Sequence, residues 1–256
     1  MKLFKLLPTI AATSLAALFV ANSHATISFH YSLNGAAWSE VTATASGSPS
    51  PITGVQSYNV DNTVEVLGWQ ISSWSGGTNS PGHNTQGAKI NETSNQLVNF
   101  SGSTGTMRLA VVSTDFTIPG LNTFTSLTSV LNGTYTSVVD NGASDQTSYS
   151  ITTYMNASNG GIDDAVVLTE DLQAHATAGP GNQSLNGAFG TGTVTVTDSW
   201  NDDEWSFITI IEATLEHQEE VNINSNNTAI PEPSAAALLG LGLAGLALGR
   251  RRARRS

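Results

Sequence analysis

The chain has 256 residues, no cysteine and a formal net charge of −11, so it supplies no disulfide, thiolate metal ligand, cysteine nucleophile or redox pair. Seven of its nine Lys and Arg residues lie at the two ends, which leaves residues 26–230 with Lys89 and Arg108 against 19 carboxylates, a formal charge of −17. A surface of that sign repels phosphate backbones, and nucleic acid is therefore excluded as a partner.

The first 25 residues have the pattern of a secretory signal peptide. Lys2 and Lys5 give a positive start, and an apolar stretch follows up to Ala21. Ser23-His24-Ala25 then places small residues at the −3 and −1 positions of a cleavage site. We expect the secretion machinery to export the chain and cleavage to follow Ala25, rather than retention of this segment as a membrane anchor.

Residues 26–220 predict an all-β domain. Apolar residues alternate with polar ones and are rich in β-branched and aromatic types, which is typical of half-buried strands. The alternating runs are Ile27–Leu33, Val64–Val66, Met107–Val111, Tyr149–Ile151, Thr193–Thr197 and Trp205–Leu215. Asn-Gly and Pro-Gly turns separate them, as at Asn132-Gly133 and Pro119-Gly120. Many short strands with such turns predict a single antiparallel β-sandwich or jelly-roll-like body.

Three polar stretches are expected to lie outside the strands. Ala43 to Pro51 and Ser72 to Thr85 are rich in Ser, Gly and Pro and are interpreted as surface loops. Residues 221–230 are rich in Asn and Ser, and we expect them to form a polar spacer between the body and the tail.

The sequence contains none of the short catalytic motifs of serine hydrolases, zinc proteases or nucleotide-binding enzymes. We therefore assign no catalytic residue. Glu65, Glu212, Glu216 and Asp198 lie on or near predicted strands, where two carboxylates about 5–9 Å apart would suit glycoside hydrolysis. With 19 acidic residues some pair meets that distance by chance, and a carbohydrate-active enzyme is the third hypothesis.

Two other groups are candidates for binding. An acidic cluster between two predicted strands offers oxygen ligands of the kind that Ca²⁺ takes. It consists of Asp198, Asn201, Asp202, Asp203 and Glu204. Its spacing matches no known calcium loop, so a solvated hairpin is the alternative. Trp69 and Trp74 would form a sugar platform if exposed, although packing in the core is favoured.

The end of the chain, residues 231–256, has three parts in order. Pro231-Glu232-Pro233 precedes an uncharged run over residues 235–249, and an arginine cluster follows it. The cluster consists of Arg250, Arg251, Arg252, Arg254 and Arg255. A 15-residue helix spans roughly 22 Å, which makes a short transmembrane helix. Because arginine-rich flanks stay in the cytoplasm, the body is expected outside the membrane, the side to which the signal peptide also sends it.

These three parts, at the extreme C-terminus and behind a signal peptide, resemble a PEP-CTERM protein-sorting domain. The resemblance implies recognition by an exosortase, a transpeptidase-like membrane enzyme. The tail would be cleaved near Pro231-Glu232-Pro233 from an inner-membrane intermediate. The body would then reach the cell surface or extracellular matrix of a Gram-negative bacterium. An ordinary single-span anchor is the alternative for this segment.

The leading hypothesis is thus a non-enzymatic surface or matrix protein associated with exopolysaccharide or biofilm. The alternative is a calcium-assisted glycan-binding adhesin.

Overall fold

The computed structural model describes residues 27–50, 54–80, 82, 87–117, 125–137, 147–156, 159–162, 172–178, 186–198 and 204–231. The signal peptide with Ala25, and the tail from Glu232 to the end with Pro233 and the arginine cluster, lie outside these residues. Every regular element in the described ranges is a β-strand, which confirms the predicted all-β class. No helix in them is long and apolar enough to cross a membrane.

The strands are numbered in their order along the chain. Their bounds are β1 Ile27–Leu33, β2 Ser39–Val41, β3 Ala43–Ser46, β4 Gln56–Val60, β5 Val64–Val66, β6 Trp69–Thr78, β7 Ala88–Asn99, β8 Gly105–Phe116, β9 Thr125–Ser137, β10 Ser148–Asn156, β11 Leu172–Ala178, β12 Asn186–Gly190, β13 Val194–Asp198, β14 Trp205–Leu215 and β15 Glu219–Pro231.

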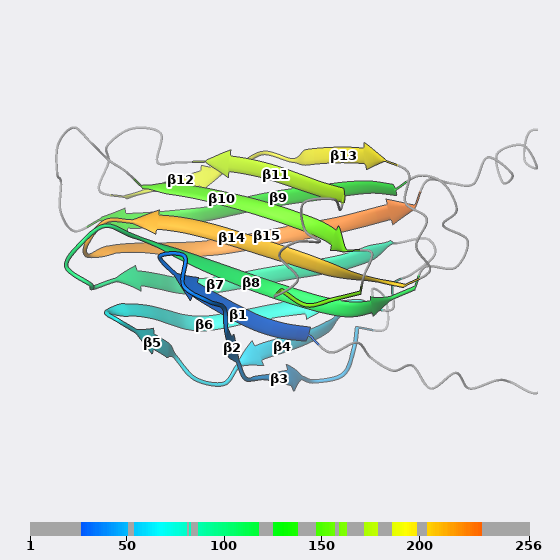
Figure 1. The fold of residues 1–256 in the computed structure, drawn as a ribbon, viewed down its shortest axis with the longest axis horizontal. Coiled ribbons are helices and arrows are strands. Elements are labelled where there is room, and N and C mark those ends of the chain that lie inside the picture. The colour runs from blue at the N-terminus through cyan, green and yellow to red at the C-terminus, as the bar shows by residue number, and fades with distance from the viewer. Residues whose placement is uncertain are drawn as a thin grey trace, which may run out of the picture.

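Two antiparallel sheets pack face to face (Figure 1). One has the order β11-β10-β14-β8-β1-β2. The other has the order β12-β9-β15-β7-β6-β4-β3, with β13 also paired to β9 and β5 to β6. The alternating runs predicted from the sequence lie in strands of both sheets. Ile27–Leu33 and Trp205–Leu215 coincide with β1 and β14.

The core between the sheets is rich in aromatic rings. Trp69, Trp74 and Trp205 are each only 1% exposed, so the predicted preference for core tryptophans is confirmed and the sugar platform at Trp69 and Trp74 is not formed. The Phe29 ring meets Trp74 edge-on at 5.2 Å, and Phe116 stacks on Trp205 at 4.8 Å. Each buried aromatic side chain removes about 150–250 Å² of surface from water, and the ring–ring contacts stabilise the core further.

The expected polar spacer over 221–230 is wrong. These residues belong to β15, which lies in the middle of the nine-stranded sheet between β7 and β9. Burial alternates along the strand, with Val221, Ile223 and Ala229 in the core. Asn222, Asn224 and Asn226 face away from it. The sequence does not show this alternation as a pattern of apolar and polar residues, because two of the inward positions are occupied by the polar residues Ser225 and Asn227.

Hydrogen bonds to both ends of the Asn227 amide offset much of the cost of burying it. Its Oδ1 accepts hydrogen bonds from Ser129 Oγ at 2.7 Å and Thr153 Oγ1 at 3.0 Å. Its Nδ2 donates to Thr209 Oγ1 at 3.1 Å. These partners lie on β9, β10 and β14, so one side chain of β15 joins both sheets. Buried amides are tolerated when paired in this way.

Both expected surface loops are also wrong in part. Ala43–Ser46 is the edge strand β3, and β6 runs through residues 72–78. The Ser/Gly composition of β6 follows from close packing. A Cβ on Gly76 would lie 2.9 Å from the Asn91 carbonyl oxygen and 3.0 Å from the Phe29 ring, so only glycine fits beneath that ring.

A buried carboxyl group was not predicted from the sequence. Glu92 of β7 is fully buried, and its Oε1 accepts a hydrogen bond from Trp74 Nε1 at 2.8 Å. Its Oε2 has no hydrogen-bond partner among the described residues. Burial raises the pKa of Glu92 to about 8, while the Trp74 hydrogen bond lowers it in part. The group is therefore protonated at neutral pH.

Replacement of Asn227 by alanine should strongly destabilise the sandwich. The change leaves the hydroxyls of Ser129, Thr153 and Thr209 without their shared partner, at an expected cost of about 2–4 kcal/mol. Urea unfolding of residues 26–231 measures the loss. Asn226→Ala is the control, because Asn226 lies exposed on the same strand and should change stability by less than about 0.5 kcal/mol. Equal effects of the two substitutions would contradict a bridging role.

Glu92 should make the fold less stable as the pH rises. The folded chain holds the proton up to about pH 8, whereas the unfolded chain releases it near the ordinary value of 4.5. The free energy of unfolding therefore falls between these two values and levels off above the higher one. Urea unfolding measured across this pH range should show that the free energy of unfolding falls less steeply for Glu92→Gln than for the wild type. The exposed control Glu40→Gln should show the same fall as the wild type. Parallel curves for all three chains would refute a protonated Glu92.

Candidate functional site

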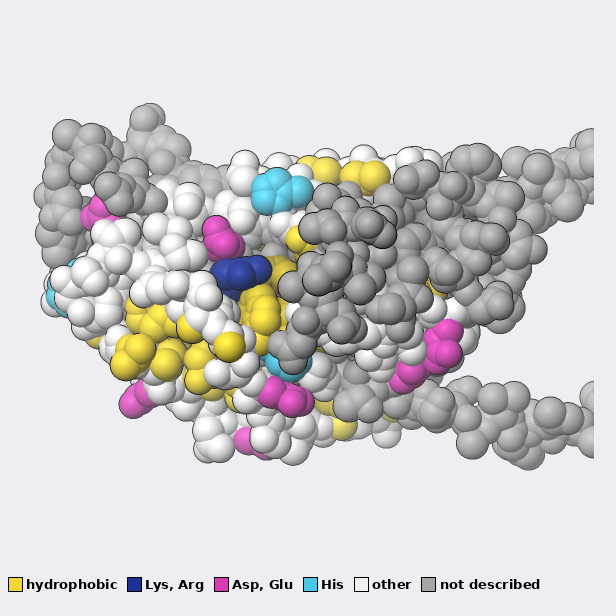
Figure 2. All heavy atoms as spheres, in the orientation of Figure 1, with side chains coloured by type: hydrophobic (Ala, Val, Ile, Leu, Met, Phe, Trp, Pro, Cys, Tyr) yellow, Lys and Arg dark blue, Asp and Glu magenta, His cyan; other side chains and the backbone are white. Residues whose placement is uncertain are grey.

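A groove of about 370 Å³ opens at one end of the sandwich, between the β5–β6 hairpin and the residue that follows β7. We call it the tip groove. It is lined by Glu65, Val66, Leu67, Gly68, Trp69, Gln70 and Phe100. Figure 2 shows apolar side chains gathered at the lower left of the molecule, over the β5–β6 end of Figure 1.

The hairpin turn beside the groove carries an unusual residue. Val66 pairs with Trp69, so Leu67 and Gly68 form a two-residue loop. Their φ angles of 45° and 82° are both left-handed, as a type I′ turn requires. Asn, Asp and Gly are the usual residues at the first position, because a larger side chain there is strained. Leu67 is nevertheless 82% exposed, so the strain is not offset by burial of its side chain.

The neighbouring chain holds this turn in place. Phe100 N donates a hydrogen bond to the Gly68 carbonyl oxygen at 2.6 Å. A Cβ on Gly68 would lie 2.8 Å from Ser101 Cα, so the two backbones meet where only glycine fits. Phe100 is 55% exposed and Trp69 is buried beneath. The large hydrophobic residues exposed in the described ranges are Leu67, Phe100 and Ile230, and two of them border this groove.

One wall of the groove is polar. Glu65 and Gln70 are cross-strand partners, and Gln70 Nε2 donates to Glu65 Oε1 at 3.5 Å. An aromatic ring, an aliphatic side chain, a carboxylate and an amide thus share one rim. Rings stack on the C–H faces of sugars, and carboxylate and amide groups bond to hydroxyls. The lining contains one carboxylate, whereas glycoside hydrolysis uses a pair.

The tip groove lies at the opposite end of the sandwich from Ile27 and Pro231, the first and last described residues. Trp69 pairs with Asn99 at the end of β7, and Gly105 pairs with Leu215 at the same end of the fold. At the other end, Ile27 pairs with Ser113 and Ala229 with Ala88. In Figure 1, β1 begins and β15 ends on the right, while the β5–β6 hairpin lies on the left. The groove therefore lies at the end of the sandwich opposite Pro231, the last described residue.

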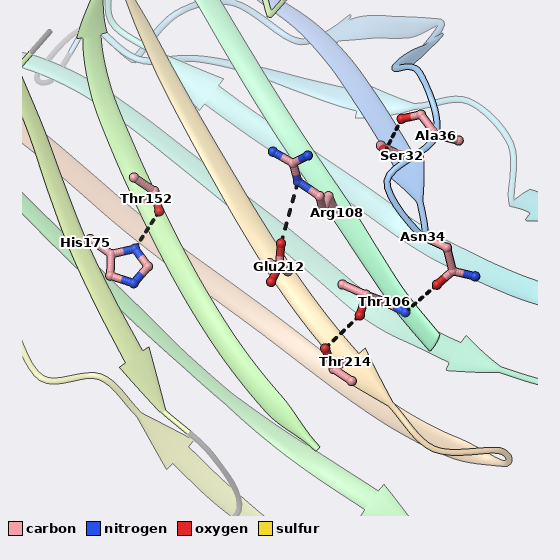
Figure 3. Close-up of polar contacts among 9 residues, drawn as sticks. All are labelled: Ser32, Asn34, Ala36, Thr106, Arg108, Thr152, His175, Glu212 and Thr214. Carbon is pink, nitrogen blue, oxygen red and sulfur yellow. Dashed lines mark hydrogen bonds and ion pairs between the residues drawn. The ribbon is translucent and has the colours of Figure 1, made fainter. Parts of the chain in front are cut away.

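A second polar region lies on the outer face of the six-stranded sheet (Figure 3). Arg108 of β8 forms an ion pair with Glu212 of β14, with Nε 3.7 Å from Oε2. The Arg108 guanidinium also lies 4.8 Å from the centre of the half-buried Trp38 ring. Burial raises the pKa of Tyr154 nearby, and a hydrogen bond to Thr152 and the charge of Arg108 lower it in part. Arg108 Nε makes no hydrogen bond to the described residues, so its contact with Glu212 is an ion pair alone.

The calcium candidates fall mostly outside the described residues. Asp198 is the last residue of β13 and Glu204 is exposed just before β14, while Asn201, Asp202 and Asp203 are among the residues not described. In the ranges that are described, no three His, Asp or Glu side chains are grouped so as to hold a metal ion. Calcium binding therefore stays a prediction.

The other predicted groups are not brought together as one site. Glu65 lies on β5 of the nine-stranded sheet, and Glu212 lies on β14 of the six-stranded sheet. Glu216 lies in the turn before β15. Sequence reasoning missed Leu67 and Phe100. A leucine before glycine in a short turn was the available signal, since that position favours Asn or Asp.

Leu67→Asn should stabilise the fold by about 1 kcal/mol, because Asn accepts the left-handed conformation that strains leucine. Leu67→Ala is the control, since alanine keeps the strain while removing the large side chain. Urea unfolding of both variants measures the difference. A loss of stability in Leu67→Asn would show that the leucine is held there by packing rather than against strain.

Comparison with solved structures finds distant likenesses, among them the following two. TmCBM61, solved in complex with beta-1,4-galactotriose, has a TM-score of 0.25 and 6% identity, covering 63% of this chain and 90% of the other. A structure from a study of carbohydrate-binding modules of the β-sandwich superfamily has a TM-score of 0.23 and 12% identity, covering 78% and 84%. TM-scores this low carry no argument about this chain.

Comparison with curated proteins finds no match. The match that bears on function lies at the C-terminus, where residues 229–255 fit the family model of the PEP-CTERM protein-sorting motif. It confirms the resemblance carried by Pro231-Glu232-Pro233, the apolar run and the arginine cluster. The chain therefore carries a PEP-CTERM sorting motif, the signal of an exported, membrane-anchored intermediate that an exosortase processes.

Proposed function

We propose that this protein is a non-enzymatic component of the extracellular matrix, whose body binds neutral polysaccharide through the tip groove. The sorting motif supports export through a membrane-anchored intermediate. The destination proposed for the body is the surface or matrix of a Gram-negative bacterium. The groove lies at the end of the body opposite Pro231.

The observation that carries the proposal is Leu67. A leucine in a left-handed turn position, 82% exposed, is unfavourable for both folding and solubility. Strain of this kind is typical of positions kept for binding. Together with Phe100 it gives the groove an apolar edge beside the Glu65–Gln70 pair, a combination that suits a sugar ring with its hydroxyls.

Charge selects the class of polysaccharide. The body carries a formal charge of −17, and Glu65 adds a carboxylate to the groove itself. Acidic polysaccharide would be repelled unless a divalent cation bridged the two. A neutral chain meets no such repulsion and needs no metal ion. The single carboxylate in the lining supports binding rather than cleavage.

Binding is tested with residues 26–231 on a glycan array and on exopolysaccharide extracted from the producing bacterium. Phe100→Ala and Leu67→Asn should each weaken binding at least about tenfold, which corresponds to about 1.4 kcal/mol. Leu67→Asn is informative because its fold should be more stable than the wild type. Trp38→Ala is the matched control, an aromatic truncation on the outer sheet face that should leave binding unchanged.

The same array separates the alternatives. Retained binding in chelator is expected for a neutral glycan held in the tip groove. Loss of binding in chelator would instead favour the calcium-assisted adhesin and the loop between Asp198 and Glu204. Release of shorter sugars from the extracted polysaccharide would show an enzyme. Absence of binding in every condition would refute glycan recognition by the body.

A further inference from the structure

The sorting motif overlaps the last strand of the body. The match to the motif begins at residue 229, and β15 extends to Pro231. Ala229 pairs with Ala88 of β7 on one side and with Leu127 of β9 on the other. Ile230 and Pro231 continue the pairing along β9. No spacer therefore separates the folded sheet from Pro231-Glu232-Pro233.

Gly87 fixes the end of this strand. It precedes β7 with a φ of 73°, and a Cβ at this position would collide with the carbonyl oxygen of Ala229. Ala229 itself is fully buried. The end of β15 is thus held by backbone contact as well as by strand pairing, up to two residues before Glu232.

An enzyme that cuts a peptide binds it as an extended segment and uses its main-chain groups on at least one edge. On the N-terminal side of Glu232, Ala229 is paired with both β7 and β9, and Ile230 and Pro231 are paired with β9. We infer that docking of the β15 end and processing by the sorting enzyme compete for the same residues, so the tail is removed before this end of the sheet closes, or while it is open.

The chemical step is the breaking of one peptide bond. The carbonyl carbon passes to water or to an amine acceptor, and the leaving amine takes a proton. A cut before Ala229 would remove that core residue, and cuts nearer Glu219 would also remove Asn227, Ile223 and Val221. The body that reaches the surface should therefore retain Ala229 and end beyond it, which mass spectrometry of the released protein measures directly.

Competition is tested in the full chain, expressed in the producing bacterium, by following the conversion of precursor to mature protein in a pulse-chase experiment. Gly87→Ala should loosen the strand end and speed conversion about tenfold, equivalent to about 1.4 kcal/mol of lost docking. Gly102→Ala is the matched control. It has a similar φ of 84° but open space around the new Cβ, and it lies at the opposite end of the fold.

A second variant changes the described body only at Pro231, the last residue of β15. A six-residue Gly/Ser insertion between Ile230 and Pro231 keeps Pro231-Glu232-Pro233 intact and moves it off the sheet, so conversion should again become faster. The same insertion after Gly102 should have no effect. Equal rates for wild type, Gly87→Ala and the junction insertion would overturn the inference. Absence of conversion in all chains would overturn it together with exosortase handling, whereas the glycan-binding proposal stands on separate measurements.

Discussion

Pairing of β15 with both β7 and β9 is the constraint on which the sandwich depends. Without β15 the nine-stranded sheet separates into two parts, because no other strand among the described residues joins β9 to β7. Asn227 extends this role across the core, since its amide bonds to hydroxyls on β9, β10 and β14. The strand that closes one sheet therefore also fixes the position of the other.

Polar residues in the core specify this arrangement in a way that apolar packing alone would not. A strand shifted by one residue would turn Asn227 outward and bring exposed asparagines into the core without partners. Glu92 acts similarly on β7, because its carboxyl meets the Trp74 indole only in one register. Both groups exchange some stability for a unique pairing, which is the best-attested use of buried polar side chains.

The sequence predicts the fold class and the clearest strands because alternation of apolar residues is a local signal. β1 and β14 were found to the residue for that reason. β15 was missed because Ser225 and Asn227 occupy inward positions, so their burial depends on hydroxyls that are distant in sequence. β6 was missed because Gly76 is set by the Phe29 ring above it, a contact that no local pattern records. The tip groove combines residues 65–70 with Phe100, and only the fold brings these together.

The order of the strands along the chain has a consequence for folding. The strand in the middle of the larger sheet, β15, is the last of the described strands to be synthesised. Until it emerges, β9 and β7 have no strand between them, and the buried hydroxyls of Ser129, Thr153 and Thr209 lack the Asn227 amide. The late position of β15 therefore delays completion of the larger sheet until the preceding strands are already available to pair with it.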